Sequence, residues 1–363
     1  MTSTPMSMNS ADVAHLDHMT DLPLPESTSA QTPAGGLVDG LIVDGSRGMY
    51  RVDTPVGVFV CTIRGRLRKQ LSYPTSASGR KSVQRVKVNE KDPVAVGDRV
   101  RLLPTGDGTG VIEEKITGAG GAFTRADPGP GQGGLTVVSG IDQIVAVFAA
   151  REPTPHLRLL DRFLALAESQ AIAALICVNK ADLGIESWLA ARLDVYRALS
   201  YAVVETSAAS GAGLDDLRGR LGGLTSAFVG PSGVGKSSLL NALEPDLGQR
   251  VSAVSGSTGK GRHTTTGTRL VPLAGGGYLA DTAGIRALAL SGVAPDQLDQ
   301  CFREFRPYLG SCRLSDCTHL HEPDCAVRAA LRTGTLDADR FESYRRLRES
   351  TAEDARAEWT DDA

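Results

Sequence analysis

A glycine-rich segment that ends in a lysine and two serines is the part of the sequence best suited to chemistry. It reads Gly230-Pro231-Ser232-Gly233-Val234-Gly235-Lys236-Ser237-Ser238 and lies between an apolar run and a leucine-rich run. In a phosphate-binding loop of this form, backbone N–H groups surround the phosphates and the following helix adds the positive end of its dipole. Lys236 would reach the β- and γ-phosphates, and the Ser237 hydroxyl would bind Mg²⁺. A chance glycine-rich turn is the alternative, but it does not explain the strand, the Lys-Ser pair and the helix together.

Two further motifs predict the base of the nucleotide. Asn179-Lys180-Ala181-Asp182 follows an apolar strand at its carboxyl end, where open α/β sheets bind ligands. The Asp182 carboxylate can accept from guanine N1–H and from the exocyclic amine, a pair that adenine lacks, so it would exclude ATP. Asn179 would hold the base and fix the loop, and the Lys180 stem would cover a ring face. Such a tetrapeptide is often only a strand-ending turn, but Thr206-Ser207-Ala208 ends the next strand and would offer a backbone N–H to guanine O6.

The segments that would sense the γ-phosphate follow the phosphate loop. Asp281-Thr282-Ala283-Gly284 ends an apolar strand, and it would supply a carboxylate to the magnesium shell and the Gly284 N–H to the γ-phosphate. Residues 257–266 are rich in Gly, Ser and Thr and are predicted as switch I, with Thr265 as the magnesium ligand when GTP is bound. A plain flexible loop is the alternative interpretation of that composition.

These groups predict attack of water on the γ-phosphate of GTP, with Lys236, the loop backbone and Mg²⁺ neutralising the developing charge. Ras-like enzymes orient the water with a glutamine after Asp-x-x-Gly, but Ile285 occupies that position. His263 in switch I is the candidate that replaces it, so Lys236, His263 and Thr265 are the predicted catalytic residues. Turnover without an activator should be slow, because nothing else aligns the water.

Three cysteines and a histidine within fourteen residues predict a metal site. They are Cys312, Cys317, His319 and Cys325, a ligand set that suits one closed, structural zinc ion. In a chain without a secretion signal, such clustering favours metal over disulfides. Core cysteines beside a surface histidine are the alternative. Cys301 and His321 are spare candidates, and Cys301 falls in an expected helical run, 295–305.

The elements around these motifs fall into separate groups. Residues 1–34 lack apolar periodicity and are predicted to be a disordered leader. Short β-rich runs at 37–43, 49–52, 57–63, 85–88, 98–103 and 110–113 then predict a small all-β barrel. A Gly/Pro-rich bridge, 118–134, leads into apolar strands at 143–149, 173–178, 202–206, 225–229 and 278–281 with helices between them, such as 155–170. This alternation predicts a parallel sheet wound with helices, followed by a helical C-terminal part.

The guanine motifs precede the phosphate loop, whereas ordinary GTPases have them last. The domain is therefore predicted to be circularly permuted, with residues 210–223 joining the old termini. The predicted domains are a leader (1–34), a barrel (35–124), a permuted GTPase domain (125–290) and a zinc-binding domain with a helical tail (291–363). Because switch II leads directly into the C-terminal segment, the nucleotide state is expected to act on that segment.

With these motifs in place, the chain resembles the RsgA (YjeQ) family of small ribosomal subunit biogenesis GTPases over roughly residues 36–350. The resemblance rests on the permuted motifs, on Cys312 to Cys325, and on the stretches 64–68 (RGRLR), 96–100 (VGDRV), 161–164 (DRFL) and 261–265 (GRHTT). It implies an N-terminal OB-fold, a permuted P-loop GTPase domain and a zinc domain that together engage the small subunit late in its maturation.

A cationic stretch in the barrel region predicts an RNA contact. Residues 64–91 hold nine basic side chains against a single acid, although the net charge of the whole chain is −3. OB-folds commonly bind RNA through loops of this kind. The candidate contacts are Arg64, Arg66, Arg68, Lys69, Arg80 and Lys81. A solvated basic loop without a ligand is the alternative, but so many like charges are hard to hold together without an anionic partner.

The sequence thus predicts a GTPase that acts on the small ribosomal subunit, needs Mg²⁺ with GTP, and is stimulated by the subunit whose rRNA it binds. A nucleotide-gated RNA-binding module with incidental hydrolysis, or an RNA-directed ATPase, are the alternatives. The chain is 41% hydrophobic and 22% charged, with no long apolar run and no signal-like N-terminus. We therefore expect a cytoplasmic monomer with no membrane contact.

Overall fold

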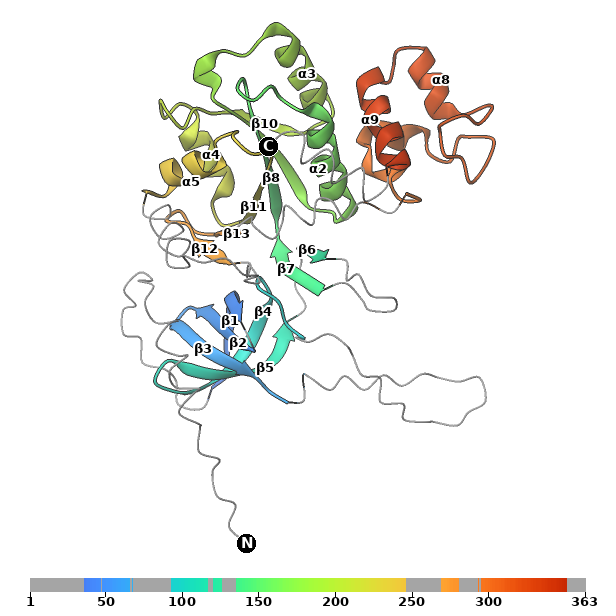
Figure 1. Ribbon diagram of the computed structural model, residues 1–363. Helices are drawn as coiled ribbons and strands as arrows, with labels where there is room; N and C mark the ends of the chain where they lie inside the picture. The colour runs from blue at the N-terminus through green and yellow to red at the C-terminus, as the bar shows by residue number, and fades with distance from the viewer. Residues whose placement is uncertain are drawn as a thin grey trace, which may run out of the picture.

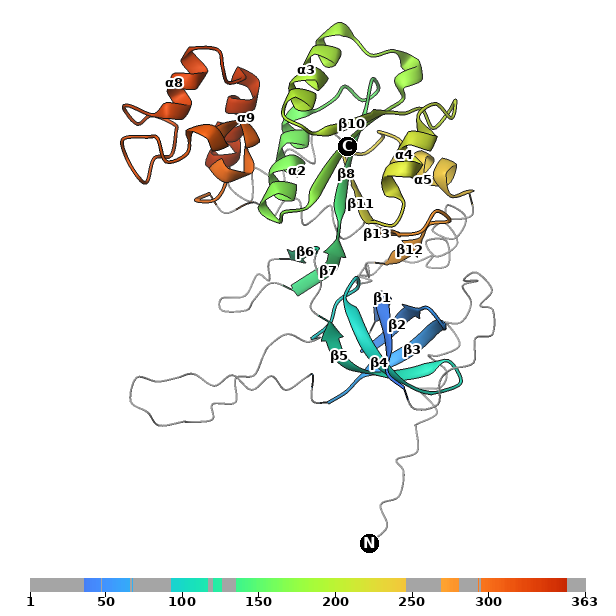
Figure 2. The same ribbon diagram turned by 180° about the vertical axis from the view of Figure 1, so that it is seen from behind.

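The computed structural model describes residues 36–46, 48–65, 67, 93–116, 120–125, 135–245, 269–280, 293 and 295–350. These residues form a β-barrel, an α/β unit and a mainly helical unit, in that order along the chain (Figure 1). The barrel lies below the α/β unit, and the helical unit lies beside helices α2 (Leu157–Ser169) and α3 (Ser187–Ala198) in both views (Figures 1 and 2). The predicted fold class is confirmed.

Five strands close the barrel in the order β1, β2, β3, β5, β4. They are β1 (Val38–Ser46), β2 (Met49–Thr54), β3 (Gly57–Ile63), β4 (Arg99–Gly106) and β5 (Thr109–Ile116). Neighbours are antiparallel except β3 and β5, which run parallel. Ile42, Val52 and Leu102 are fully buried, because alternate residues of each strand face the barrel interior. The arrangement is that of an OB-type barrel, and the predicted strand 85–88 lies outside the described residues.

A short antiparallel pair joins the barrel to the α/β unit. β6 (Gly121–Arg125) pairs with β7 (Leu135–Ile141), and β6 lies within the stretch that was predicted as a bridge without regular structure. Ser139 in β7 donates its N–H to the Val96 carbonyl at 2.9 Å and its hydroxyl to Asp98. Gly140 has φ +63°, and a Cβ there would lie only 2.5 Å from the Gly97 carbonyl oxygen. The stretch 96–100 therefore forms the junction with the α/β unit, and Gly140 allows the close approach.

The α/β unit is built on six strands in the order β10, β9, β8, β11, β13, β12. They are β8 (Gln143–Ala149), β9 (Ala173–Asn179), β10 (Ala202–Glu205), β11 (Thr225–Val229), β12 (Leu270–Pro272) and β13 (Tyr278–Ala280). All pairs are parallel except β12 with β13. Counted from β11, the strands lie in the order 6-5-4-1-3-2, so the phosphate loop follows strand 1 and the guanine motifs follow strands 5 and 6. This is the permuted order.

Helices cover both faces of the sheet. α2 and α3 pack on one face, and α4 (Leu214–Leu221) and α5 (Lys236–Leu243) on the other (Figure 1). Along β8, Ile144, Ala146 and Phe148 join the cluster of α2, while the residues between them join the cluster of α4 and α5. Each large apolar side chain buried in this way contributes about 1.5–3 kcal/mol. Burial on both faces explains why β8 is a continuous apolar run.

The helical unit contains η2 (Asp299–Cys301), η3 (Arg303–Tyr308), α8 (Ala326–Arg332) and α9 (Ala338–Glu349). The predicted helical run 295–305 is only partly helical: residues 295–298 form turns, and the two short 3-10 helices η2 and η3 follow. Phe302 breaks it with an extended backbone at φ −100° and ψ 105°, and Pro307 in η3 cannot donate a backbone hydrogen bond. The core is aromatic: the Tyr344 ring lies 5.4 Å from Phe302 and 4.8 Å from Phe305.

No helix of the described residues is long and apolar enough to cross a membrane. The predicted domain boundaries remain predictions. The boundary between residues 124 and 125 falls within β6, whose partner β7 lies on the GTPase side.

Candidate functional site

The phosphate-binding loop candidate connects β11 to α5 at the carboxyl edge of the sheet. Gly230 follows β11 with φ +143°, and a Cβ on it would overlap the Val147 carbonyl oxygen of β8. Only glycine lets the loop start this close to the neighbouring strand. Pro231 and Val234 are buried, whereas Ser232 and Gly233 are exposed. The loop is thus anchored by its buried residues and exposed at Ser232 and Gly233. α5 begins at Lys236, and the first N–H groups of a helix have no partner within it.

Lys236 turns back into the loop and is only 6% exposed. Its Nζ donates to the Gly230 carbonyl at 2.8 Å and to the Pro231 carbonyl. Ser237 and Ser238 lie exposed in the first turn of α5. The loop therefore gathers an ammonium group, backbone N–H groups and two hydroxyls at one helix N-terminus, which suits a polyphosphate with a bound cation.

Asn179 connects three of the predicted motifs. It ends β9, is 1% exposed, and donates from Nδ2 to the Val234 carbonyl of the phosphate loop at 2.9 Å. Its Oδ1 accepts from the Thr206 hydroxyl at 3.3 Å and from the Ala208 N–H at 3.2 Å. The segment Thr206-Ser207-Ala208 was predicted to offer a backbone N–H to guanine O6, and the Ala208 N–H of that segment is bonded to Asn179 in this structure. Strands β9, β10 and β11 are thereby held in one arrangement at the edge where the motifs meet.

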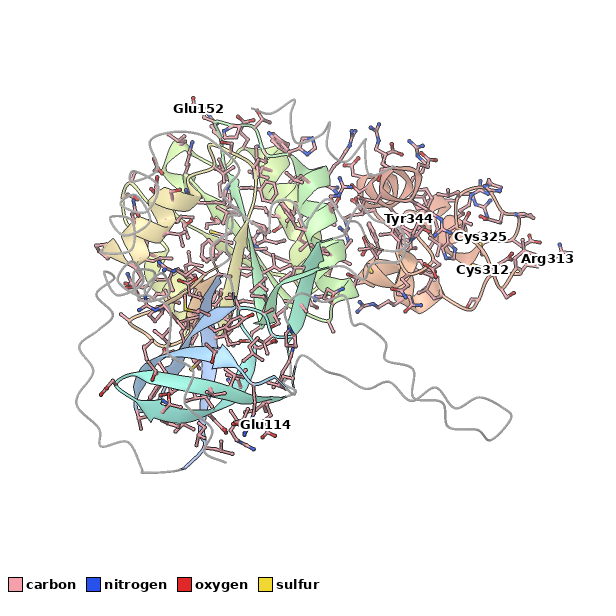
Figure 3. The ribbon with its side chains drawn as sticks, turned by 60° about the horizontal axis from the view of Figure 1, so that its bottom comes forward. Glu114, Glu152, Cys312, Arg313, Cys325 and Tyr344 are labelled. Atoms are coloured by element: carbon pink, nitrogen blue, oxygen red, sulfur yellow. The ribbon has the colours of Figure 1, made fainter. Side chains whose placement is uncertain are left out.

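The base-reading candidates lie at the rim of this edge. Asp182 is exposed in η1 (Ala181–Leu183), while Ser207 is fully buried and its Oγ accepts from the Ser210 N–H at 3.1 Å. Lys180 has φ +59° and donates from Nζ to the Glu152 carbonyl, at the upper end of the α/β unit in Figure 3. The exposed Asp182 carboxylate beside the Lys180 stem is accessible to a guanine base that binds at this edge of the sheet.

Several predicted residues cannot be placed against this geometry. His263, Thr265, Asp281 and Gly284 lie outside the described residues, as do Arg66, Arg68, Lys69, Arg80 and Lys81. Chain connectivity alone relates the first group to the site: β13 ends at Ala280, one residue before Asp281, and it lies directly beside β11.

Arg64 is the RNA candidate that the structure describes. Its guanidinium is half exposed and pairs with the Glu113 carboxylate in β5, which is only 6% exposed. The pair and its hydrogen bond raise the pKa of Arg64. Arg64 thus covers a buried acid of the barrel, and a phosphate would have to compete with that acid for it.

The predicted metal ligands come together in the helical unit. The ligand atoms of Cys312, Cys317, His319 and Cys325 all lie within 4.8 Å of one another. Cys312 Sγ is 3.8 Å from Cys325 Sγ and 3.6 Å from His319 Nδ1, and His319 Nδ1 is 3.4 Å from Cys325 Sγ. Tetrahedral zinc with Zn–S bonds of about 2.3 Å separates its ligand atoms by about 3.5–3.8 Å. The donor set and its spacing fit zinc, and Cys312 and Cys325 face each other beside Tyr344 (Figure 3).

Neighbouring groups orient this candidate metal centre. Glu322 accepts from the N–H groups of Thr318 and His321, at 2.8 and 3.2 Å, and from the Thr318 hydroxyl. Asp299 Oδ2 lies 3.4 Å from His319 Nε2, the side on which a carboxylate orients a histidine ligand. Cys301 is 3% exposed in the core, and neither it nor His321 joins the ligand group.

Sequence reasoning missed the buried charge cluster that holds the helical unit on the α/β unit. Arg340 in α9 is 1% exposed and pairs with Asp161 in α2 and with Glu304, both at 2.6 Å. The Tyr196 hydroxyl donates to the same Asp161 at 2.7 Å. The stretch 161–164 was noted as a motif, but its partner lies 179 residues away in a highly charged segment, where no pattern marks one arginine as buried.

Comparison with known proteins gives a consistent result. The model of the RsgA GTPase family matches residues 123–291. A small ribosomal subunit biogenesis GTPase RsgA from Gemmatimonas aurantiaca is 42% identical over 313 residues, which cover 85% of this chain and 96% of the relative. A protein of the same name from Moorella thermoacetica is 38% identical and covers 85% of this chain and 95% of its own.

Two solved structures resemble the fold over most of the chain. The crystal structure of YjeQ from Thermotoga maritima has a TM-score of 0.65 at 29% identity and covers 86% of this chain and 98% of its own. That of YloQ, described as a circularly permuted GTPase, has a TM-score of 0.64 at 27% identity, with 88% and 97% covered.

Proposed function

Because the chain belongs to the RsgA GTPase family and hydrolyses GTP, we propose that it acts in the biogenesis of the small ribosomal subunit, late in its maturation. Relatives that match it over most of their length carry small ribosomal subunit biogenesis in their names. The single structural observation that best supports the nucleotide part is Asn179, which joins the phosphate loop to both guanine motifs.

In the proposed mechanism, GTP lies along the carboxyl edge of the sheet. Asp182 reads guanine, and the base is positioned by Asn179, Lys180, Ser207 and Ala208. Residues 230–238 and the Gly284 N–H hold the phosphates, while Asp281 supplies a carboxylate to the magnesium shell. Lys236 neutralises charge on the γ-phosphate as water attacks it in line. Mg²⁺, held by Ser237 and Thr265, would neutralise the phosphate oxygens further.

The activating step is proposed to come from the subunit. Docking through the basic segment of the barrel and through the zinc-binding unit would bring His263 to the attacking water. The zinc ion, held by three thiolates and one imidazole, would leave no open coordination position and serve structure alone. The chain would work as a cytoplasmic monomer.

Turnover of GTP measured with and without purified small ribosomal subunits tests the proposal. We expect the subunit to stimulate turnover roughly tenfold or more. The stimulation should fall steeply as the salt concentration rises, because the basic segment contacts RNA phosphates. His263→Ala should lower the stimulated rate far more than the affinity for GTP. Lack of stimulation by any ribosomal particle would reject the ribosomal role, and binding to subunits without stimulation would favour a nucleotide-gated RNA-binding module. Competition by ATP would favour an ATPase.

A further inference from the structure

The β12–β13 hairpin contacts the barrel at two points along its length. Arg269, directly before β12, donates from Nε and Nη2 to Asp44 Oδ2 in β1, at 3.1 and 2.5 Å. Tyr278, the first residue of β13, donates its hydroxyl to Asp53 Oδ2 in β2 at 2.7 Å. In both views the hairpin lies between the barrel and the rest of the sheet (Figures 1 and 2). We call Asp44, Asp53, Arg269 and Tyr278 the barrel clamp.

The barrel clamp is partly withdrawn from solvent. The Arg269 and Asp44 side chains are 31% and 19% exposed, so their attraction is screened less than that of a fully exposed pair. Arg51 lies beside them and is 8% exposed; its pKa is lowered by burial and by Arg269, against an opposing effect of Asp44. The negative charge of Asp44 therefore offsets the repulsion between Arg51 and Arg269, and removing that charge would leave the two guanidinium groups repelling each other.

Both ends of the hairpin continue into the segments predicted to sense the γ-phosphate. Arg269 follows Thr265 by four residues, and Ala280, the last residue of β13, directly precedes Asp281. β13 also pairs with β11, the strand that leads into the phosphate loop. A displacement of the hairpin relative to β11 would therefore act on both segments through the chain itself.

Among the described ion pairs, the helical unit has none to the β12–β13 hairpin. It contacts the opposite side of the α/β unit: Arg340 bonds to α2, Arg303 bonds to Glu168 at the end of α2, and Arg192 of α3 bonds to Asp337. Besides its junction at β7, the barrel is thus attached through the clamp to the phosphate-sensing side of the sheet, whereas the helical unit is attached to the guanine-reading side.

From this arrangement we propose that Asp44 and Asp53 are positioning residues for GTP hydrolysis. They hold the β12–β13 hairpin to the barrel, so a ligand on the barrel biases the segments that continue from both ends of the hairpin. The coupling is reciprocal: if a ligand on the barrel changes the affinity for a nucleotide by some factor, the nucleotide must change the affinity for that ligand by the same factor. That the barrel ligand is ribosomal RNA rests on the proposed function; the clamp itself does not.

A first experiment tests the clamp without any ribosomal particle. Backbone amide exchange in β1 and β2 is compared with Mg²⁺ and either GDP or a non-hydrolysable GTP analogue, in the parent and in Asp44→Asn/Asp53→Asn. Exchange in β1 should differ at least threefold between the nucleotides in the parent and become nucleotide-independent in the variant. Equal exchange in the parent with both nucleotides would overturn the proposal.

The control is Asp39→Asn/Glu114→Gln. It also removes two barrel carboxylates, both partners of Arg101. Among the described residues neither has a hydrogen bond or ion pair to the hairpin, and Glu114 lies at the far end of the barrel (Figure 3). Since net charge changes equally, any general gain in attraction for RNA is matched. If the clamp double variant does not fold, Tyr278→Phe removes one hydroxyl and tests the same coupling.

A second experiment measures the ratio of subunit-stimulated to basal turnover at saturating subunit. The ratio should fall at least fivefold in the clamp variant and stay at the parental value in the control, whose basal turnover and KM for GTP should also be unchanged. A parental ratio in the clamp variant would reject the positioning role. If the parent itself is not stimulated, the proposed function fails, while the exchange experiment still decides the clamp.

Discussion

At the residue scale, guanine preference is expected to depend on one exposed carboxylate. Asp182→Asn should lower affinity for GTP and raise that for xanthosine nucleotides, which carry a carbonyl where guanine has its amine. Loss of a charged hydrogen bond of about 1.5–3 kcal/mol corresponds to a change of roughly tenfold to a hundredfold. Competition binding with both nucleotides measures it, and parental selectivity would remove Asp182 from the site.

Local chemistry explains which site residues could be predicted. The loop glycines, Lys236 and the cysteines could be predicted, because a phosphate or a zinc ion requires these residue types at this spacing. Such reasoning was insufficient for Ala208, because its N–H donates to Asn179 Oδ1 at 3.2 Å. Which partner a backbone group takes depends on how three strands meet at one edge, and no single segment contains that information.

Arg64 also gained a structural role that its position in a basic stretch did not suggest. Because it covers the largely buried Glu113, removing it would disturb the barrel as well as any RNA contact. Tests of RNA binding are therefore cleaner at the other basic residues of the stretch.

At the element scale, we expect the loop between η3 and α8 to depend on its four candidate metal ligands. One zinc ion per chain should be found by metal analysis, and Cys317→Ser should lower the melting temperature of the helical unit while leaving GTP affinity unchanged, because folding and metal binding are coupled. Cys61→Ser, in the barrel, is the matched control and should keep its zinc. A metal-free chain of full stability would contradict the assignment.

The start of α9 provides a pH-dependent contact. Burial would raise the pKa of Asp337, but the hydrogen bonds from Arg192, at 2.7 and 2.9 Å, and from the Arg340 N–H outweigh it and lower the pKa below 3.8. Its contribution is therefore present above the unfolded-state value and lost as pH falls through the lowered folded-state pKa.

Asp337→Asn isolates that charge, because asparagine also caps helices. At pH 7 the variant should be less stable by roughly 1–2 kcal/mol, as expected for a partly buried charged hydrogen-bond pair. The difference should shrink as pH falls below the unfolded-state pKa and vanish once pH lies below the lowered folded-state pKa. Denaturant unfolding at several pH values measures it, and a constant difference would mean that the charge of Asp337 is not its cause.

Elements were predictable where their signal was strong. β3, β8 and β11 match their predicted bounds, since each is a continuous or alternating apolar run between turns. β6, β7 and β12 were missed because Gly, Pro or polar residues interrupt their apolar residues, so they gain their stability from the neighbouring strand rather than from their own composition.

At the scale of the whole molecule, the buried cluster of Arg340, Asp161 and Glu304 sets how firmly the helical unit is docked. Burial would lower the pKa of Arg340, but the two carboxylates raise it well above its ordinary value, so it stays charged. Arg340→Ala would leave two acids without it and should cost about 3–5 kcal/mol. Calorimetry should then show the helical unit unfolding separately. Arg345→Ala, in the same helix but partly exposed, is the control, and an equal loss of stability in both variants would contradict the role of the cluster.

The position of β8 between β9 and β11 also sets what a growing chain can bind during its own synthesis. β8, β9 and β10, with both guanine motifs, leave the ribosome before β11 does. β11 pairs with β8 through residues that come 83 positions later, such as Ser226 with Gln143. Until then one edge of β8 stays open, at risk of pairing with another chain. The nascent protein therefore carries a base-reading half without a phosphate-binding half, and it can acquire its nucleotide only when most of its length has been made.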